Sequence, residues 1–448
     1  MKKNPAPHLV FLASLLVLAA ALVIRGGSAI ADPLEDSIVN GQAWQSLNDA
    51  FLSAGKVVDD PNLPATPTQR AQGYRNLLRI IADAEKLSIE FSDPERPILT
   101  KIYDLGTKFA IDNPDTIYFT APVLPDATYV IHGRPARLKR FADQQPPHFV
   151  SLGVLKVVGT STQQVGSLNN GNGSLHTQRG SEYDGEFSAV VSATPPADGA
   201  NWVQLEPGDH TQRVFIRETF NDWSREVPLR LSIERTDQLG AAPRLTASQL
   251  ATQMTLMGAT VASLASRWPQ VAIQTRAQLG ENVLPAVMDR PDITGLPGQL
   301  YSIGYYHVED GQALLVEFPA PTGCFYWGAQ AANLFAESLD YANHQTSVNG
   351  AQAYVDPDGT VRLVVARQDP GVANWIDVGE DDATGQGMIV LRFTECGQTS
   401  SFPAPQAKLR SIGELPGALP LRYPTISAGA RAQSLAVRRQ HLAIRLEE

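Results

Sequence analysis

The pattern of apolar and polar positions predicts helices in three parts of the chain. Apolar residues repeat at helical spacing in residues 43–58, 69–87 and 245–279. Such stripes are typical of helices that pack one face against a core. Thr246 or Ser248 is expected to cap the third segment. We predict a long helix there that connects two parts of the protein, with a break at its internal proline, Pro269.

Two other parts of the chain have the pattern of β-structure. From about residue 102 to 240, and from 299 to 396, short β-branched and aromatic runs alternate with clusters of Gly, Asn, Asp and Pro. Val214-Phe215-Ile216 is one such run. This alternation is typical of strands connected by tight turns.

The C-terminal part differs from both patterns. Residues 402–424 are rich in proline and predict an extended arm. Ser427 is expected to cap a final helix. That helix carries four arginines that we expect on a solvated face: Arg431, Arg438, Arg439 and Arg445.

The two β segments share an ordered set of residues, which predicts an internal duplication. Offsets of 174, 173 and 175 residues relate the Asp-Gly, Asn-Trp and Arg elements of the two copies. The first copy contains Tyr129, Asp184-Gly185, Val190-Val191, Asn201-Trp202 and Arg217. The second contains Phe325 or Tyr326, Asp358-Gly359, Val364-Val365, Asn374-Trp375 and Arg392.

These observations predict an α+β, β-dominated protein with two related β-sandwich or jelly-roll-like domains. Helices are expected at the N-terminus, in the connection and at the C-terminus. The predicted boundaries are a signal peptide at 1–31, an N-terminal helical region at 32–100, a first β domain at 101–240, a connecting helical segment at 241–290, a second β domain at 291–400, and a proline-rich arm with a final helix at 401–448.

The N-terminus has the features of a secretory signal. Lys2 and Lys3 precede an apolar run over residues 9–24, and Ala29-Ile30-Ala31 offers a cleavage site. We expect a protein exported to the periplasm or the medium, with an uncleaved inner-membrane anchor as the alternative. No later segment is apolar enough to span a bilayer.

Charge and composition limit the classes of ligand and partner that we expect for this protein. The 36 Lys and Arg residues against 46 Asp and Glu residues give a net charge of −10. The chain has no basic stripe for phosphate contacts, so nucleic acid is not an expected partner. The eight histidines are scattered and the chain has no C-x-x-C motif, so we expect no metal site. The sequence also has no glycine-rich phosphate-binding motif, so we expect no nucleotide cofactor. The oligomeric state stays open.

The two cysteines, Cys324 and Cys396, both lie in the second β segment. An exported protein matures where disulfides persist. The two residues form one bridge, or they are two buried thiols in neighbouring strands.

A cluster of aromatic, amide and charged residues is the candidate ligand site. Aromatic faces suit the apolar faces of sugars and polyols, while amides and Arg orient their hydroxyls. The predicted ligand-binding residues are Tyr326, Trp327, Gln330, Tyr341, Asn349 and Arg392. The alternative is an aromatic core with polar loops, and Trp202 and Trp375 are expected mainly to serve the core.

Carboxylates supply the candidates for acid–base chemistry. In Asp112-Asn113-Pro114-Asp115, the proline fixes a turn from which both acids could project the same way. Asp340 and His344 are the other catalytic candidates. We therefore keep three hypotheses: a protein that binds a small polar ligand, an enzyme that acts on such a ligand, and a structural envelope protein.

Several residue strings also resemble the bacterial proteins carrying domain of unknown function 1214. The strings are Gln72-Gly73-Tyr74-Arg75, Asp112-Asn113-Pro114-Asp115, Asn201-Trp202, Glu337-Ser338-Leu339-Asp340-Tyr341, Asp369-Pro370-Gly371 and Asn374-Trp375. The resemblance spans about residues 40–400. It implies a β-rich fold with helical additions and brings no settled activity, so it assigns no catalytic residue.

Overall fold

The computed structural model describes residues 32–138, 143–158, 161–178, 184–210, 212–237, 240–290, 296–379, 384–397 and 402–446. The predicted signal peptide at 1–31 lies outside the described residues. Among the helices of the described ranges, none combines the length and apolar character that a membrane crossing requires.

The helices predicted from the periodicity are present. The longer ones are α1 (Pro33–Val39), α2 (Gln42–Gly55), α3 (Pro67–Glu85), α4 (Ala247–Leu279) and α6 (Ala428–Leu446), joined by the short helices η1 (Lys56–Asp59), η2 (Lys86–Glu90), η4 (Ile412–Glu414) and α5 (Leu415–Ala418). Thr66 caps α3, Thr246 forms a capping box with Gln249 at the start of α4, and the Ser427 hydroxyl accepts a hydrogen bond from Ala430 N.

The predicted break at Pro269 is wrong, because α4 continues through this residue. Pro269 is buried together with Ala265, Trp268 and Ala272. Proline removes one hydrogen bond of the helix. The apolar contacts of the surrounding turn hold the helix in place despite that loss.

The first β domain is a sandwich of two sheets. Its five-stranded sheet has the order β1 (Thr100–Ile102), β2 (Thr116–Val123), β8 (Gln212–Thr219), β4 (Phe149–Val158), β5 (Ser161–Asn169). Its four-stranded sheet has the order β7 (Asn201–Gln204), β6 (Phe187–Ser192), β3 (Tyr129–Pro135), β9 (Leu229–Arg235). Alternate residues of the two sheets face each other and form one apolar core.

The second β domain repeats this arrangement. Its five-stranded sheet has the order β10 (Met288–Asp289), β11 (Gln299–His307), β17 (Gln386–Cys396), β13 (Cys324–Ala332), β14 (Ser347–Asn349). Its four-stranded sheet has the order β16 (Trp375–Asp377), β15 (Thr360–Ala366), β12 (Gln312–Pro319), β18 (Gln406–Ser411). Cys324 and Cys396 lie opposite one another in β13 and β17 and form a disulfide.

The predicted duplication is present in the strand order and in single contacts. The Asn201 amide donates to Ser188 O and His176 O, and the Asn374 amide donates to Arg362 O and Tyr354 O. The indole nitrogens of Trp202 and Trp375 donate to Ser192 O and Ala366 O, at the same relative positions. These side chains hold a short parallel strand beside β6 or β15, so the motif is a folding motif.

The predicted pairing of Tyr129 with Phe325 or Tyr326 is wrong. Tyr129 lies in β3 opposite Val191, and the equivalent residue of β12 is Leu314, opposite Val365. Tyr326 in β13 corresponds instead to Phe149 in β4, because these two residues face Thr394 and Thr219 at matching positions of the central strands. The loops between the strands differ in length in the two copies. The sequence offset that relates the other motifs therefore does not lead from Tyr129 to its equivalent residue.

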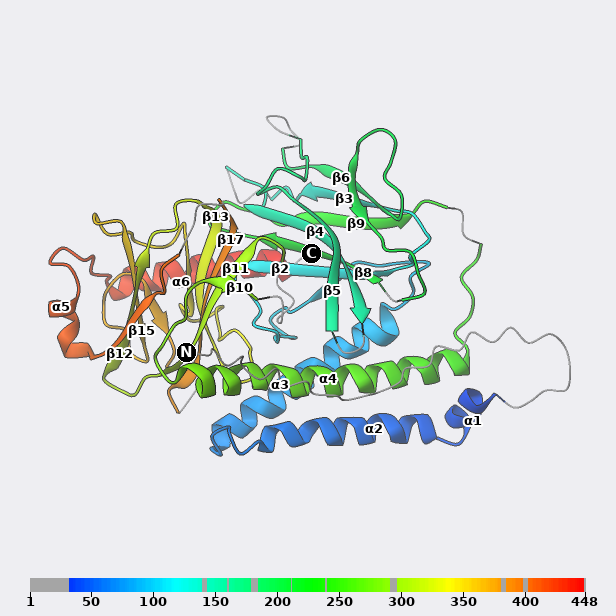
Figure 1. Ribbon diagram of the computed structural model, residues 1–448, viewed down its shortest axis with the longest axis horizontal. Helices are drawn as coiled ribbons and strands as arrows, with labels where there is room; N and C mark the ends of the chain where they lie inside the picture. The colour runs from blue at the N-terminus through cyan, green and yellow to red at the C-terminus, as the bar shows by residue number, and fades with distance from the viewer. Residues whose placement is uncertain are drawn as a thin grey trace, which may run out of the picture.

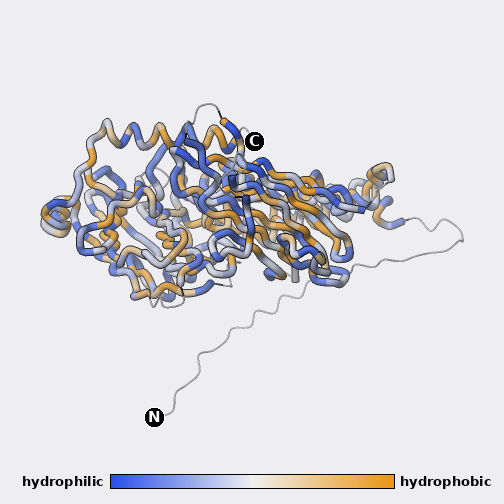
Figure 2. The backbone as a smooth tube through the Cα atoms, turned by 90° about the horizontal axis from the view of Figure 1, so that it is seen from above, coloured by the Kyte–Doolittle hydropathy of each residue, from blue (hydrophilic) through white to orange (hydrophobic). Residues whose placement is uncertain are grey.

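Helices α2, α3 and α4 pack together in a layer on one side of the β domains (Figure 1). One apolar cluster joins α2, α3 and α4 to the face of β11 and β17 that points away from the second sandwich core. Apolar and polar residues are interspersed along the backbone, as Figure 2 shows by hydropathy. The central strands β8 and β17 are buried at nearly every position, and so on both faces.

Two predictions for the C-terminal part are corrected. The stretch expected to be an extended arm contributes β18, which pairs with β12, and its residues Leu415, Leu419 and Tyr423 cover the outer face of that sheet. The arginines of α6 were expected to be solvated, but Arg431, Arg438 and Arg445 are buried, and Arg439 is exposed. The helix lies against both domains, where backbone carbonyls accept hydrogen bonds from the three buried guanidinium groups.

Candidate functional site

Residues 111–115, here called the interdomain loop, are the last part of the connection from β1 to β2 and are held by both domains. Its backbone carbonyls accept hydrogen bonds from Arg392 at Ile111, from Gln330 at Asp112 and from Arg445 at Pro114. Residues from the second β domain and from α6 thus hold a loop that belongs to the first.

The Asp112 carboxylate is buried and fully engaged. Its Oδ1 accepts a hydrogen bond from Ser338 N at 2.8 Å and its Oδ2 one from the Ser338 hydroxyl at 2.6 Å. Burial raises the pKa of Asp112, and the neighbouring Lys108 opposes that shift. The carboxylate therefore fixes the turn around Ser338 and does not face solvent.

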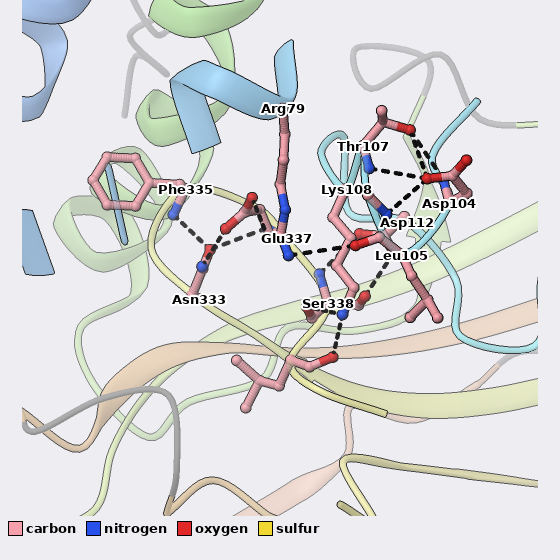
Figure 3. A network of polar contacts seen from close by, with 12 residues as sticks. Arg79, Asp104, Leu105, Thr107, Lys108, Asp112, Asn333, Phe335, Glu337 and Ser338 are labelled. Atoms are coloured by element: carbon pink, nitrogen blue, oxygen red, sulfur yellow. Dashed lines mark hydrogen bonds and ion pairs between the residues drawn. The ribbon is translucent and has the colours of Figure 1, made fainter. Parts of the chain in front are cut away.

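A buried charge cluster surrounds Asp112, as Figure 3 shows. Lys108 Nζ donates to Ser338 O and to Leu339 O, at 3.1 and 2.7 Å, and burial lowers the pKa of this ammonium. Arg79 Nη1 donates to Glu337 Oε1 at 2.8 Å. Two cations and two anions thus balance where α3, the interdomain loop and the 333–339 turn meet.

Asp115 is the centre of a second buried network. Its Oδ1 accepts a hydrogen bond from the Trp223 indole at 2.9 Å, and its Oδ2 accepts one from the Tyr326 hydroxyl at 2.7 Å. Burial raises the pKa of Asp115, while Tyr326, Arg438 and Arg445 act in the opposite direction. The prediction that Asp112 and Asp115 project the same way is wrong, because each carboxylate belongs to a different network.

The predicted ligand-binding residues separate into two groups. Tyr326, Gln330 and Arg392 lie on the interdomain face of the second domain, where Arg392 Nη1 donates to Gln330 Oε1 at 2.7 Å and Gln330 Nε2 donates to Asp112 O at 2.7 Å. Asn349 joins them through an amide contact of 3.4 Å to Phe220 O. All four side chains are at most 5% exposed.

Trp327 and Tyr341 do not face this group. Trp327 follows Tyr326 in β13 and so points to the other face of the sheet, into the second sandwich core. Tyr341 lies in the first sandwich core, with Lys108 Nζ 4.4 Å from the centre of its ring. The predicted aromatic site for sugars is therefore not assembled by these two residues.

Asp340 and His344 lie in a turn beyond the buried networks. Asp340 caps that turn by accepting hydrogen bonds from Ala342 N and Asn343 N. His344 Nδ1 lies 3.0 Å from Asp377 Oδ2, and both side chains are partly exposed. Asp340 influences the pKa of Lys108, as Asp112 does, but its carboxylate is hydrogen-bonded to its own turn.

A surface pocket of about 290 Å³ lies beside the buried charge cluster. Its walls are Arg75, Leu78 and Arg79 of α3 with Leu105 and Gly106 of the following loop. Arg79 is one of the lining residues, and its guanidinium donates hydrogen bonds to Glu337 Oε1 and to Leu105 O. Arg75 and Leu78 are exposed, and Arg75 has no ion pair or hydrogen bond to a described residue.

The sequence analysis did not select the arginines of this pocket. Arg75 and Arg79 are four residues apart, which places them on one helical face, and that spacing was the available signal. Lys108 and Arg445 were missed as well, because their partners lie more than two hundred residues away. Within the described ranges, no three His, Cys, Asp or Glu side chains are grouped as a metal ion would require.

Known proteins show the fold but no activity. An uncharacterised protein from Burkholderia cenocepacia has a crystal structure similar to this chain, with a TM-score of 0.75 and 27% sequence identity over 85% of this chain and 99% of that one. A protein from Vibrio parahaemolyticus is more distant, with a TM-score of 0.37 and 12% identity over 76% and 98% of the two chains. No family model matches the sequence. No curated protein matches it either.

The Burkholderia structure has the same overall architecture as this protein. Because it matches nearly its whole length to this chain, the α+β fold with two β domains is shared with that protein. The resemblance to proteins carrying domain of unknown function 1214 stays a prediction.

Proposed function

We propose that the protein binds a small polar ligand that carries a carboxylate, such as an acidic sugar, in the pocket lined by Arg75, Leu78 and Arg79. The observation that carries this proposal is Arg79, which lines the pocket and whose guanidinium is held in place by Glu337. A guanidinium has five N–H donors, and the two bonds to Glu337 and Leu105 O leave others for a ligand.

The remaining walls suit the same class of ligand. Arg75 lies one turn before Arg79 and adds a second positive charge without a partner among the described residues. Leu78 is 66% exposed between them and offers an apolar surface to a sugar ring. Paired guanidinium groups bind a carboxylate through charge-assisted hydrogen bonds.

Buried networks take up four of the residues predicted for ligand binding or catalysis. The side chains of Asp112, Asp115, Tyr326 and Gln330 are at most 2% exposed and bind groups of the protein itself. They fix the interdomain loop and the turn that carries Glu337, the residue that holds Arg79. The binding hypothesis therefore keeps the class of small polar ligand and places it at a different site.

Calorimetric titration with glucuronate and with glucose tests the proposal. These two sugars differ in one carboxylate, so we expect the purified protein to bind glucuronate more tightly. Arg75→Gln should weaken glucuronate binding about tenfold or more, since a hydrogen bond to a charged group contributes about 1.5–3 kcal/mol. Arg439→Gln, which changes an exposed arginine of α6, is the matched control.

Two results would contradict the proposed site. Glucuronate binding that is unchanged in Arg75→Gln would place the ligand elsewhere. If neither sugar, nor any member of a wider panel of acidic sugars and polyol acids, binds the wild-type protein, the ligand class is wrong.

A further inference from the structure

Arg217 is a buried cation for which the described part of the chain supplies no carboxylate partner. It lies in β8, the central strand of the five-stranded sheet of the first domain, on the face that points away from the sandwich core. The side chain is 8% exposed, and its Nη1 atom is buried. Among the described residues, no atom accepts a hydrogen bond from Arg217.

The surroundings of Arg217 are aromatic and neutral. Its guanidinium carbon lies 4.4 Å from the centre of the Phe215 ring, and Tyr118 is its neighbour on β2. Burial lowers the pKa of Arg217, whereas Tyr118, Tyr301 and Tyr103 raise it and Arg392 lowers it. Burial also raises the pKa of Tyr118 and Tyr103, so these phenols are uncharged at neutral pH. None of these neighbours supplies a negative charge.

The duplication places a second arginine at the equivalent position. Arg392 lies opposite Tyr301 in the second domain, as Arg217 lies opposite Tyr118 in the first. Figure 1 shows β8 and β17, the strands that carry the two arginines, inside their respective sheets. Arg392 donates to neutral acceptors, which include the Gln330 amide oxygen and Ile111 O. Two guanidinium groups, one from each domain, therefore influence one another, and neither forms an ion pair with a described residue.

Buried charges in proteins are normally paired, because an ion loses its hydration on burial. An anion between the two domains would supply the missing charge. Arg217 offers a planar set of N–H donors that matches a carboxylate. The Tyr118 hydroxyl accepts a hydrogen bond from Asn113 N at 3.1 Å and keeps its own O–H to donate.

We propose that Arg217 is the anchor of a second binding site, at the boundary of the two β domains, which takes a small carboxylate of about the size of acetate. This site shares no residue with the pocket lined by Arg75 and Arg79 and goes beyond the proposed function. The aromatic walls restrict it to a compact ligand, and Arg217 and the Tyr118 hydroxyl supply the donors.

The test uses acetate and the purified protein in a buffer whose only other anion is a bulky sulfonate. We expect acetate to raise the melting temperature of the wild type, because a ligand that binds only the folded state stabilises it. The shift should be absent in Arg217→Gln, and calorimetric titration should show acetate binding reduced at least tenfold. Arg217→Lys, which keeps the charge and loses the planar donors, should bind with intermediate affinity. Arg439→Gln, which changes an exposed arginine of α6 outside both sites, is the control and should bind acetate as the wild type does.

Stability in the absence of acetate gives a second readout. An unpaired buried cation destabilises the folded state, so Arg217→Gln should melt above the wild type in the sulfonate buffer. A lower melting temperature would mean that groups of the protein hold Arg217, and it would count against the site. An equal acetate shift in the wild type and in Arg217→Gln, or no acetate shift in the wild type, would overturn the proposal.

Discussion

The Tyr326 hydroxyl donates a hydrogen bond to Asp115 Oδ2 at 2.7 Å and so joins β13 of the second domain to the interdomain loop of the first. The same hydroxyl accepts a hydrogen bond from Asn113 Nδ2 at 3.1 Å. One buried phenol thus satisfies two polar groups of a loop from the other domain. The duplicated position in the first domain is Phe149, which has no hydroxyl, so the two copies have diverged at this contact.

Removal of this hydroxyl should destabilise the protein. Tyr326→Phe leaves one oxygen of Asp115 and the Asn113 amide without their partner, which costs about 1–3 kcal/mol in the free energy of unfolding. Urea denaturation followed by tryptophan fluorescence measures the change. Tyr74→Phe, at a tyrosine that is 50% exposed on α3, is the control and should stay within about 0.5 kcal/mol of the wild type. Equal stability of the two variants would contradict this role of Tyr326.

Adjacent arginines of α6 should differ sharply in their contribution to stability. Arg438 Nη1 donates to the Ser347 hydroxyl at 3.1 Å, and its guanidinium carbon lies 5.0 Å from the centre of the Trp223 ring. Arg439, the next residue, is exposed. We expect Arg438→Gln to lower the free energy of unfolding by about 2–4 kcal/mol and Arg439→Gln to lower it by less than about 0.5 kcal/mol, as measured by urea denaturation. Similar losses in the two variants would show that α6 does not depend on its buried face.

The fold was predictable from the sequence because its signals are local or repeated. The helical stripes mark α2, α3 and α4, and the caps Thr66 and Thr246 act within three residues of the chain. The Asn-Trp motif recurs because each copy must hold a short parallel strand with the same contacts. Pro269 misled the prediction, since its cost to the helix is local, whereas the packing that offsets it comes from distant residues.

The site was less predictable, because sequence neighbours in a strand point to opposite faces. Tyr326 and Trp327 are adjacent in the chain, yet one enters the interdomain network and the other enters a sandwich core. The partners of Asp112 and Arg445 lie in other parts of the chain, which no spacing rule reveals. The exception is Gln330 with Arg392, predicted together and joined by a hydrogen bond across neighbouring strands.

Loss of the disulfide should lower stability substantially. Cys324 and Cys396 are 72 residues apart, so the bond restricts a long loop of the unfolded chain. For a loop of this length, the chain-entropy estimate is about 4 kcal/mol at 25 °C. We expect dithiothreitol to lower the urea midpoint of the wild type, and the double variant Cys324→Ala, Cys396→Ala to have a low midpoint that dithiothreitol does not change. A wild-type midpoint that is insensitive to reduction would contradict the expectation.

The Asp83 carboxyl should make stability decrease as pH rises. Asp83 lies on the buried face of α3, and the nearest cation in an ion pair is Lys86, at 3.8 Å. Burial raises the pKa of Asp83 from 3.8 to about 7, although Lys86 opposes the shift. Between these two values, the unfolded chain has released this proton and the folded chain still holds it. Stability attributable to Asp83 is therefore present below about pH 4 and is lost as pH rises toward about 7.

Comparison of Asp83→Asn with the wild type isolates this group from other titrating residues. Asparagine resembles the protonated carboxyl and does not titrate. The free energy of unfolding of the variant, relative to that of the wild type, should therefore rise by up to about 1.4 kcal/mol per pH unit between about pH 4 and 7. Urea denaturation at several pH values gives the difference in the free energy of unfolding. Asp49→Asn, at an exposed position of α2, controls for the loss of a charge and should show no such trend. A difference between Asp83→Asn and the wild type that is constant across this range would mean that Asp83 titrates alike in the folded and unfolded chains.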